Sequence, residues 1–309
     1  SDIFVYNRET GYIKRVSVSS NQEQGNDWSH AIDISADGRY ITFASSSTNL
    51  VTGDSNGFSD IFVHDQVTDQ TKRVSVSSSG EEANEGSDYP SISADGRFIV
   101  FFSNASNLVL GDTNNKQDVF VHDIQTGQTR RASVSSTGAE ANYRSVYSDI
   151  SADGRFIVFG SEASNLVDGD TNNSIDVFVY DQHTSQTVLI SVSSSGVLGN
   201  SNSDRPSISE DGRFITFISD SSNLVPNDDN GLMDIFVHDR KKHLTTMVSI
   251  SSNGMQANNW SGETIIAANG CCIAFTSAAT NLVTGDTNGK VDVFLRQTNY
   301  MIFLPIIER

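Results

Sequence analysis

The sequence predicts an all-β protein, a β-propeller of four-stranded blades built from tandem 58-residue repeats. Three observations support this: a ten-residue block that recurs at constant spacing, an Asp-Gly pair inside the well-kept copies of that block, and strands that are apolar on both faces. Ser, Asn, Asp, Gly and Thr crowd the rest of the chain, which is typical of short strands joined by polar turns. Long helices are not expected.

The recurring block supplies the first two strands of each unit. An Asp-Gly pair between two apolar runs predicts a tight type I′ hairpin, so Pro90–Ser93 and Arg97–Ser103 are expected to pair. The copies read ISADGRYITF at 34–43, ISADGRFIVF at 92–101 and 150–159, ISEDGRFITF at 208–217 and IAANGCCIAF at 266–275.

A second block opens the third strand with an aspartate, as in DIFVHD at Asp60. The second and third strands are apolar on both faces, whereas the fourth, expected at Arg73–Ser78, alternates Val with Ser and is placed at the outer edge. One such sheet cannot bury two apolar faces alone. Stacking the units around a ring buries both faces and protects most edges; a linear β-solenoid is the alternative.

The block ISADGRFIVF resembles the S-x-D-G-x-x-I-x-F signature of the TolB-like propeller repeats, also called PD40 or WD40-like repeats, and the resemblance covers essentially the whole chain. It implies a ring of six or a similar number of blades. Members of this family include periplasmic scaffolds that bind other proteins and propellers attached to peptidases or lyases, so the resemblance implies no fixed activity.

The strand count is uneven. A single propeller domain, residues 1–309, is expected to hold five units plus a surplus half-blade at 1–20, in five or six positions. At the other end, residues 300–309 replace the Val/Ser edge strand with the apolar run YMIFLPII, which an exposed edge does not tolerate. This segment is expected either to close its own ring or to be donated to another molecule, and head-to-tail strand addition generates filaments.

The loop between the second and third strands repeats as G-D-x-N-x-x-x-D. Oxygen ligands at the first, third and seventh positions of a tight loop can wrap Ca²⁺, so calcium is the candidate cofactor, although the bidentate Glu of an EF-hand is missing. In the alternative, the Asp and Asn side chains bond their own backbone in Asx-turns without an ion. The candidate metal ligands are Asp54, Asn56, Asp60, Asp112, Asn114, Asp118, Asp170, Asn172, Asp176, Asp228, Asn230, Asp234, Asp286, Asn288 and Asp292.

The long loops between fourth and first strands vary most from unit to unit, which on a repeat scaffold marks a binding face. Their aromatic side chains can stack on sugar rings or anchor a protein partner; packing between blades is the alternative. The candidate partner-binding residues are Trp28, Tyr89, Tyr143, Tyr147 and Trp260 in these loops, with Ile302, Phe303, Leu304 and Ile306 in the C-terminal segment.

Composition excludes several functions. A net charge of −18 without a Lys/Arg cluster argues against nucleic acid and anionic membranes, and no apolar run is long enough for a membrane-spanning helix. The two cysteines are adjacent, Cys271 and Cys272, so no disulfide framework is possible. No catalytic motif is present, and carboxylates repeated in every unit lack the unequal constellation that catalysis needs. The repeat-equivalent His64, His122 and His238 alternate with Tyr180, which favours packing over catalysis.

We therefore expect a non-catalytic propeller, exported from a bacterial cell to its surface or beyond, with any export signal outside this chain. It is expected to act as a structural scaffold that binds a protein partner or copies of itself. A carbohydrate-binding or polysaccharide-processing propeller is the competing interpretation.

Overall fold

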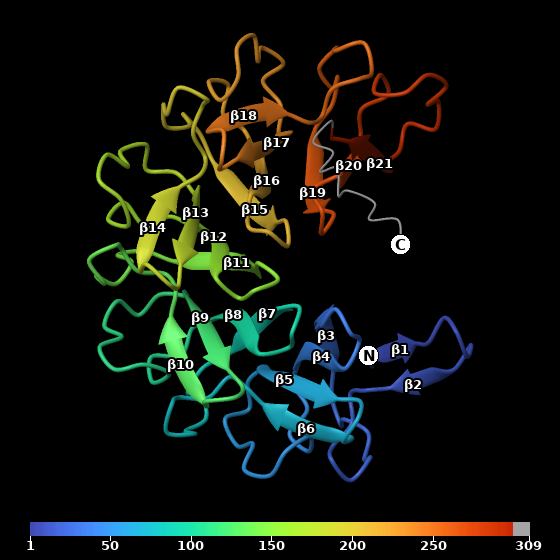
Figure 1. The fold of residues 1–309 in the computed structure, drawn as a ribbon, viewed down its shortest axis with the longest axis vertical. Coiled ribbons are helices and arrows are strands. Elements are labelled where there is room, and N and C mark those ends of the chain that lie inside the picture. The colour runs from blue at the N-terminus through green and yellow to red at the C-terminus, as the bar shows by residue number, and fades with distance from the viewer. Residues whose placement is uncertain (299–309) are drawn as a thin grey trace, which may run out of the picture.

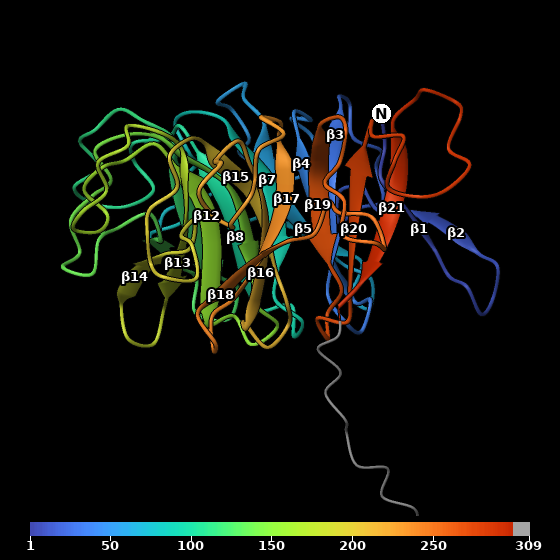
Figure 2. The same cartoon turned by 90° about the horizontal axis from the view of Figure 1, so that it is seen from above.

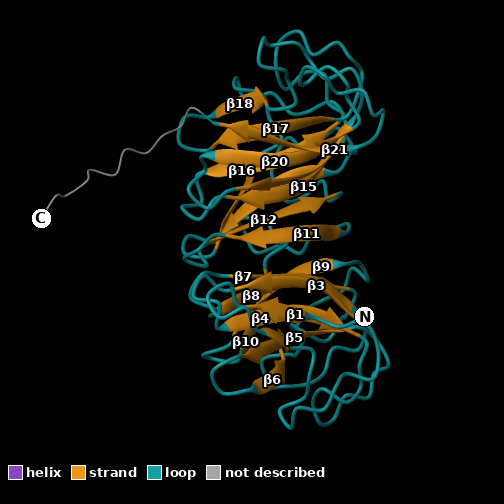
Figure 3. Ribbon diagram, turned by 90° about the vertical axis from the view of Figure 1, so that its right-hand side faces the viewer, coloured by secondary structure: helices purple, strands orange, loops and turns teal. Residues whose placement is uncertain are grey.

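The computed structural model describes residues 1–298, and within them every regular element is a strand. Figure 1 shows the sheets following one another around a central axis, and Figure 3 shows the same strands from the side, without helices. None of the described residues forms a helix that could span a membrane. The β-propeller prediction is confirmed.

Four sheets are complete antiparallel meanders of four strands, and their strand order along the sheet follows the chain. The first holds β3 (Ser29–Ile34), β4 (Tyr40–Ser45), β5 (Asp60–Asp65) and β6 (Gln70–Arg73). The second holds β7 (Ser87–Ile92), β8 (Phe98–Ser103), β9 (Asp118–Asp123) and β10 (Gln128–Arg131). The third holds β11 (Ser145–Ile150), β12 (Phe156–Ser161), β13 (Asp176–Asp181) and β14 (Gln186–Leu189). The fourth holds β15 (Ser203–Ile208), β16 (Phe214–Ser219), β17 (Asp234–Asp239) and β18 (Leu244–Met247).

Two sheets at the ends of the chain are smaller. The N-terminal hairpin of β1 (Phe4–Tyr6) and β2 (Ile13–Arg15) forms a two-stranded sheet. The last sheet contains three described strands, β19 (Ser261–Ile266), β20 (Cys272–Ser277) and β21 (Asp292–Gln297). The predicted half-blade is therefore present, and the proposed C-terminal strand at 300–309 lies outside the described residues.

Two local predictions were wrong. The first hairpin turn is not type I′, because only Gly96 of the Asp95-Gly96 pair has a positive φ, 74°. The Gly96 amide donates to the Ser93 carbonyl at 2.8 Å, so the turn ends in a left-handed glycine, as in longer hairpin loops built on a type I turn. The fourth strand is β6 at Gln70–Arg73, and residues after it such as Val74, 1% exposed, are buried and not half in water.

The hydrophobic core lies between the sheets. Ile61 and Val63 on one face of β5 pack against Ile92, Ile99 and Phe101 of the next sheet. The opposite face of β5 presents Phe62, which belongs to a cluster with Ile3 of the N-terminal hairpin. Each third strand of the four complete sheets therefore buries one set of side chains against the sheet before it and the alternate set against the sheet after it.

Candidate functional site

The G-D-x-N loops fold as turns whose asparagines bond within the loop. Asn56 Nδ2 donates to Asp60 Oδ2 at 3.1 Å, and Asn56 Oδ1 accepts the Phe58 amide at 2.7 Å. The same pair of contacts occurs at Asn114, Asn172, Asn230 and Asn288. Asn56 thus turns its donor toward the aspartate and uses its oxygen for the backbone, the Asx-turn arrangement.

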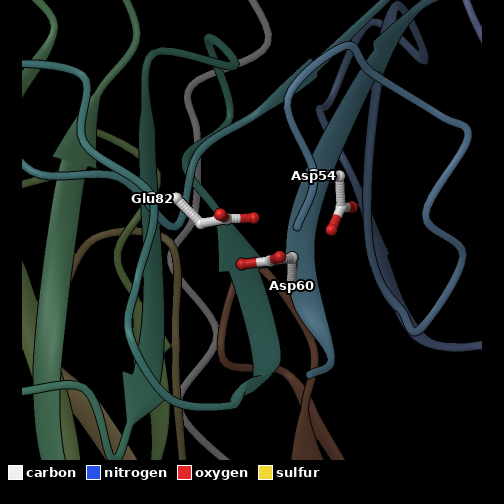
Figure 4. Close-up of side chains that lie close together, drawn as sticks. All are labelled: Asp54, Asp60 and Glu82. Atoms are coloured by element: carbon white, nitrogen blue, oxygen red, sulfur yellow. The ribbon is translucent and has the colours of Figure 1, made fainter. Parts of the chain in front are cut away.

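Three carboxylates converge beside this loop in the first complete sheet. Figure 4 shows Asp54, Asp60 and Glu82 pointing toward one another. The guanidinium of Arg73 lies among them: its Nη1 is 3.7 Å from Asp54 Oδ1 and 3.4 Å from Asp60 Oδ2, and it also binds Glu82. In the next sheet Arg131 takes the same place among Asp112, Asp118 and Glu140. In both sheets an arginine already supplies positive charge to the cluster.

The third and fourth complete sheets lack this arginine. The repeat places Leu189 and Met247 at the position of Arg73, while the paired aspartates remain. Burial raises the pKa of Asp176 to about 6, with a smaller contribution from Asp170. Burial also raises the pKa of Asp228 to about 6, aided by the charge of Asp234. These two sheets hold buried carboxylates without a neighbouring arginine in the loop.

The innermost strands share a bulge that redirects one side chain. In each first strand the register shifts at one residue with positive φ, between 37° at Glu263 and 51° at Tyr89 and Arg205. The equivalent residues are Ala31, Tyr89, Tyr147, Arg205 and Glu263. Positive φ is strained for residues other than glycine and is often found where a side chain is placed for function. Unlike the repeated loops, this position varies among the five sheets: it is alanine, tyrosine in two sheets, arginine or glutamate.

Two of the predicted aromatic residues meet here. The rings of Tyr89 and Tyr147 are 5.7 Å apart, edge to face, and Arg205 lies over Tyr147 at 5.2 Å and pairs with Glu263. These side chains border one hollow. The remaining loop aromatics do not line this hollow. Trp28 and Trp260 are exposed, and the Lys116 ammonium lies 4.7 Å from the centre of the Tyr143 ring. The four predicted residues Ile302, Phe303, Leu304 and Ile306 lie outside the described residues.

The repeated histidines are structural. Nδ1 of His64, His122 and His238 lies 2.9 Å from Oγ1 of a threonine on the fourth strand of the same sheet. All three are buried, and burial lowers the pKa of each. Each of these buried imidazoles, held by a threonine, packs within its sheet.

Apolar side chains are exposed on both sides of the opening between the last sheet and the N-terminal hairpin. Ile34 of β3 is 47% exposed, whereas its four repeat equivalents are each 6% exposed. Phe4 of β1 is 52% exposed and its equivalents at Phe62, Phe120, Phe178 and Phe236 are 0%. On β21, Val293 and Leu295 are 75% and 68% exposed, although the same positions in the complete sheets are at most 4% exposed.

The count of strands predicts the half-blade but does not by itself indicate which side chains a missing strand leaves exposed. The signal was available. Ile92 packs against the sheet before its own, and subtracting the 58-residue period from it identifies the matching residue of the first complete sheet. Ile34 is that residue in the first complete sheet, where the sheet before it has two strands.

The architecture is shared with known propellers. No family model matches the chain, and no curated protein matches it in sequence. Among solved structures, TolB from Acinetobacter baumannii superposes with a TM-score of 0.51 and 14% identity, over 96% of this chain and 60% of that one. A protein described as TolB from Agrobacterium tumefaciens superposes with a TM-score of 0.52 and 17% identity, over 96% of this chain and 90% of that one. One of two prolyl endopeptidases superposes with a TM-score of 0.57 and 12% identity, over 95% of this chain and 37% of the peptidase chain.

These similarities define the protein as a β-propeller with a TolB-like fold, which confirms the resemblance of the repeats at the level of fold. The chain spans 60% of the length of the Acinetobacter TolB and 37% of that of the peptidase chain. At identities of 12–17%, the similarity supports the arrangement of sheets and does not transfer an activity.

Proposed function

We propose that this chain is a non-catalytic propeller scaffold, exported to the bacterial surface or beyond, that binds other proteins and copies of itself by accepting strands at its incomplete blade. The observation that carries the proposal is the pair of apolar faces at the opening, formed by Phe4 and Ile34 on one side and by Val293 and Leu295 on the other. Apolar side chains that are buried in every complete sheet and exposed here indicate an interaction site.

Head-to-tail assembly follows from the two faces being different. Val293 and Leu295 of β21 occupy the positions that a complete sheet packs against the sheet after it. Phe4 of β1 occupies the position that a complete sheet packs against the sheet before it. A contact between unlike faces repeats from copy to copy and builds a filament unless the rotation closes. The negative charge of −18 suits a soluble exported protein and keeps such contacts confined to uncharged patches.

The experiment is size-exclusion chromatography with light scattering, followed by electron microscopy, over a range of protein concentrations. The wild-type chain is expected to form species larger than one copy. The double variant Val293→Asp/Leu295→Asp is expected to remain monomeric, because it places two charges on a face that assembly buries. Both positions are exposed, so the fold is expected to survive.

Val67→Asp is the matched control, since Val67 lies in the turn between β5 and β6 of a complete sheet and is 72% exposed. It introduces the same charge and is expected to leave assembly unchanged. A wild-type protein that stays monomeric at high concentration would remove self-assembly from the proposal. Equal assembly by the double variant would show that the β21 face is not the contact.

Carbohydrate binding is the second candidate, and the hollow bordered by Tyr89 and Tyr147 favours it. Aromatic rings with a neighbouring ion pair, here Arg205 and Glu263, offer a stacking surface and hydrogen-bonding groups for sugar hydroxyls. A glycan array tests this function. Binding that is lost in Tyr147→Ala and kept in Tyr143→Ala would support it, and an array without hits would exclude it for the glycans tested.

We also propose calcium as a bound cation, best supported in the third and fourth complete sheets. Asp176 and Asp234 are buried there, and the repeat has no arginine among them. In the first two sheets an ion would have to displace Arg73 or Arg131 from the carboxylates. A hard cation prefers oxygen ligands such as these.

A further inference from the structure

Two neighbouring side chains lie together where the second strand of each complete sheet begins. The guanidinium carbon of Arg97 lies 4.7 Å from the centre of the Phe98 ring, and the same contact occurs at residues 39–40, 155–156 and 213–214, at 4.7, 4.6 and 4.5 Å. Consecutive side chains of a regular strand point to opposite faces of the sheet. The end of this turn therefore brings together two side chains that a regular strand would separate.

In the last sheet, the same two positions are occupied by Cys271 and Cys272, the only cysteines of the chain. Their Sγ atoms are 2.7 Å apart, and both residues are partly exposed. Within residues 1–298, neither thiol has another hydrogen-bond partner. The hydrogen bond with the Cys271 thiol is the main cause that raises the pKa of Cys272. The fold thus holds two thiols in contact, where small reagents can reach them.

A third substitution accompanies the two cysteines. In the complete sheets the arginine of the turn bonds an aspartate at the end of the third strand, as Arg97 does with Asp123 at 3.0 and 2.7 Å. The repeat places Gln297 at the position of that aspartate. The backbone contact beside it is kept, since the Thr298 amide donates to the Cys271 carbonyl at 2.8 Å. The last sheet therefore keeps its backbone pairing here, while the ion pair that uses the arginine elsewhere has been replaced.

The backbone of both cysteines is anchored. The Cys271 amide donates to Asn269 Oδ1 at 3.0 Å, the Cys272 carbonyl accepts the Ala267 amide at 2.9 Å, and Cys272 pairs with Gln297 in the ladder. A disulfide between neighbours closes a small ring, because consecutive Cα atoms are only about 3.8 Å apart and most disulfides span ~4.4–6.8 Å. Such a ring is strained and easily reduced. The pair therefore suits reversible oxidation.

We infer that Cys271 and Cys272 form a redox site that exchanges electrons with low-molecular-weight disulfides. The thiolate of one cysteine attacks a sulfur of the reagent, forms a mixed disulfide and releases the first reagent thiolate. The thiolate of the other cysteine then attacks the protein sulfur of the mixed disulfide, so that the Cys271–Cys272 bond forms and the second reagent thiolate leaves. The two protons given up by the cysteines are taken up by the two reagent thiolates. This site is independent of the proposed scaffold function.

The test uses the full chain, first reduced and then incubated with oxidised glutathione over a range of concentrations. Remaining thiols are alkylated, and the mass of the intact chain is measured. The wild type is expected to lose two hydrogens and to carry neither glutathione nor the alkyl label, and dithiothreitol is expected to restore both thiols. Cys271→Ser and Cys272→Ser each keep one thiol, so both are expected to accumulate as the glutathione mixed disulfide.

A titration in urea separates the contribution of the fold from mere adjacency in the sequence. At a fixed concentration of reduced glutathione, the folded chain is expected to close its disulfide at an oxidised glutathione concentration about tenfold lower than the unfolded chain does, since only the fold holds the thiols in contact. Cys271→Arg/Cys272→Phe is the matched control, because it restores the residues of the complete sheets. It is expected to fold as the wild type does and to show no change of mass.

Three results would overturn the inference. The first is a wild-type chain that ends as the mixed disulfide or as a disulfide-linked dimer, as a single thiol would. The second is a pair of thiols that remains open to alkylation in excess oxidised glutathione. The third is an equal titration midpoint for the folded and unfolded chains, which would show that the contact between the Sγ atoms contributes nothing.

Discussion

Truncating one phenylalanine at two equivalent repeat positions tests whether the opening exists in solution. Phe120 and Phe4 occupy the same place on the third strand, but Phe120 is 0% exposed and its ring lies 6.0 Å from that of Phe101. Phe120→Ala removes a fully buried ring and leaves a cavity, which costs about 3–5 kcal/mol of unfolding free energy.

Phe4→Ala is expected to cost much less. Phe4 is 52% exposed, so folding removes only about half of its side chain from water. Water can also fill the space that the ring leaves. Half of the ~1.5–3 kcal/mol for full burial of an apolar side chain is about 1 kcal/mol. The two variants should therefore differ by at least ~2 kcal/mol, from these two terms.

Urea unfolding followed by circular dichroism measures both losses, at a concentration where the protein is monomeric. If Phe4→Ala costs as much as Phe120→Ala, then Phe4 is covered in the isolated protein and the opening does not exist.

Three further predictions concern the carboxylates. Calcium is expected to raise the melting temperature of the protein above its value in chelator. Asp176→Asn should reduce that rise more than Asp118→Asn does, because Arg131 already neutralises the Asp118 cluster. No rise in the wild type would exclude calcium. The pKa of Asp176 in the folded chain is raised to about 6 from the ordinary 3.8, so in chelator its contribution favours folding at low pH and is lost as pH rises through about 6. Melting temperatures from pH 4 to 8 should fall less in Asp176→Asn than in wild type, and an equal fall would contradict the assignment. Arg97→Ala breaks the two hydrogen bonds to Asp123, at 3.0 and 2.7 Å, and should lower the midpoint of urea unfolding, whereas an unchanged midpoint would show that the pair is solvated.

Much of this protein could be predicted from the sequence because each level of the repeat agrees with the others. The 58-residue period, the Asp-Gly turns and the doubly apolar strands all require sheets that shelter one another, and the structure has that arrangement. The half-blade at residues 1–20 was also predictable, since a missing block shows in the count of strands. The turn type and the limits of the fourth strand were not, because one Asp-Gly pair is compatible with several loop lengths.

Only the tertiary structure decided which side chains act together. In the sequence, Arg73 and the carboxylates of Asp54, Asp60 and Glu82 are far apart and give no sign of a cluster. They meet because a loop, the fourth strand and the loop after it fold against one another. Ile34 reads in sequence as one more core isoleucine. Its exposure depends on a neighbouring sheet with two strands, and the burial of a residue on one sheet is set by the sheet packed against it.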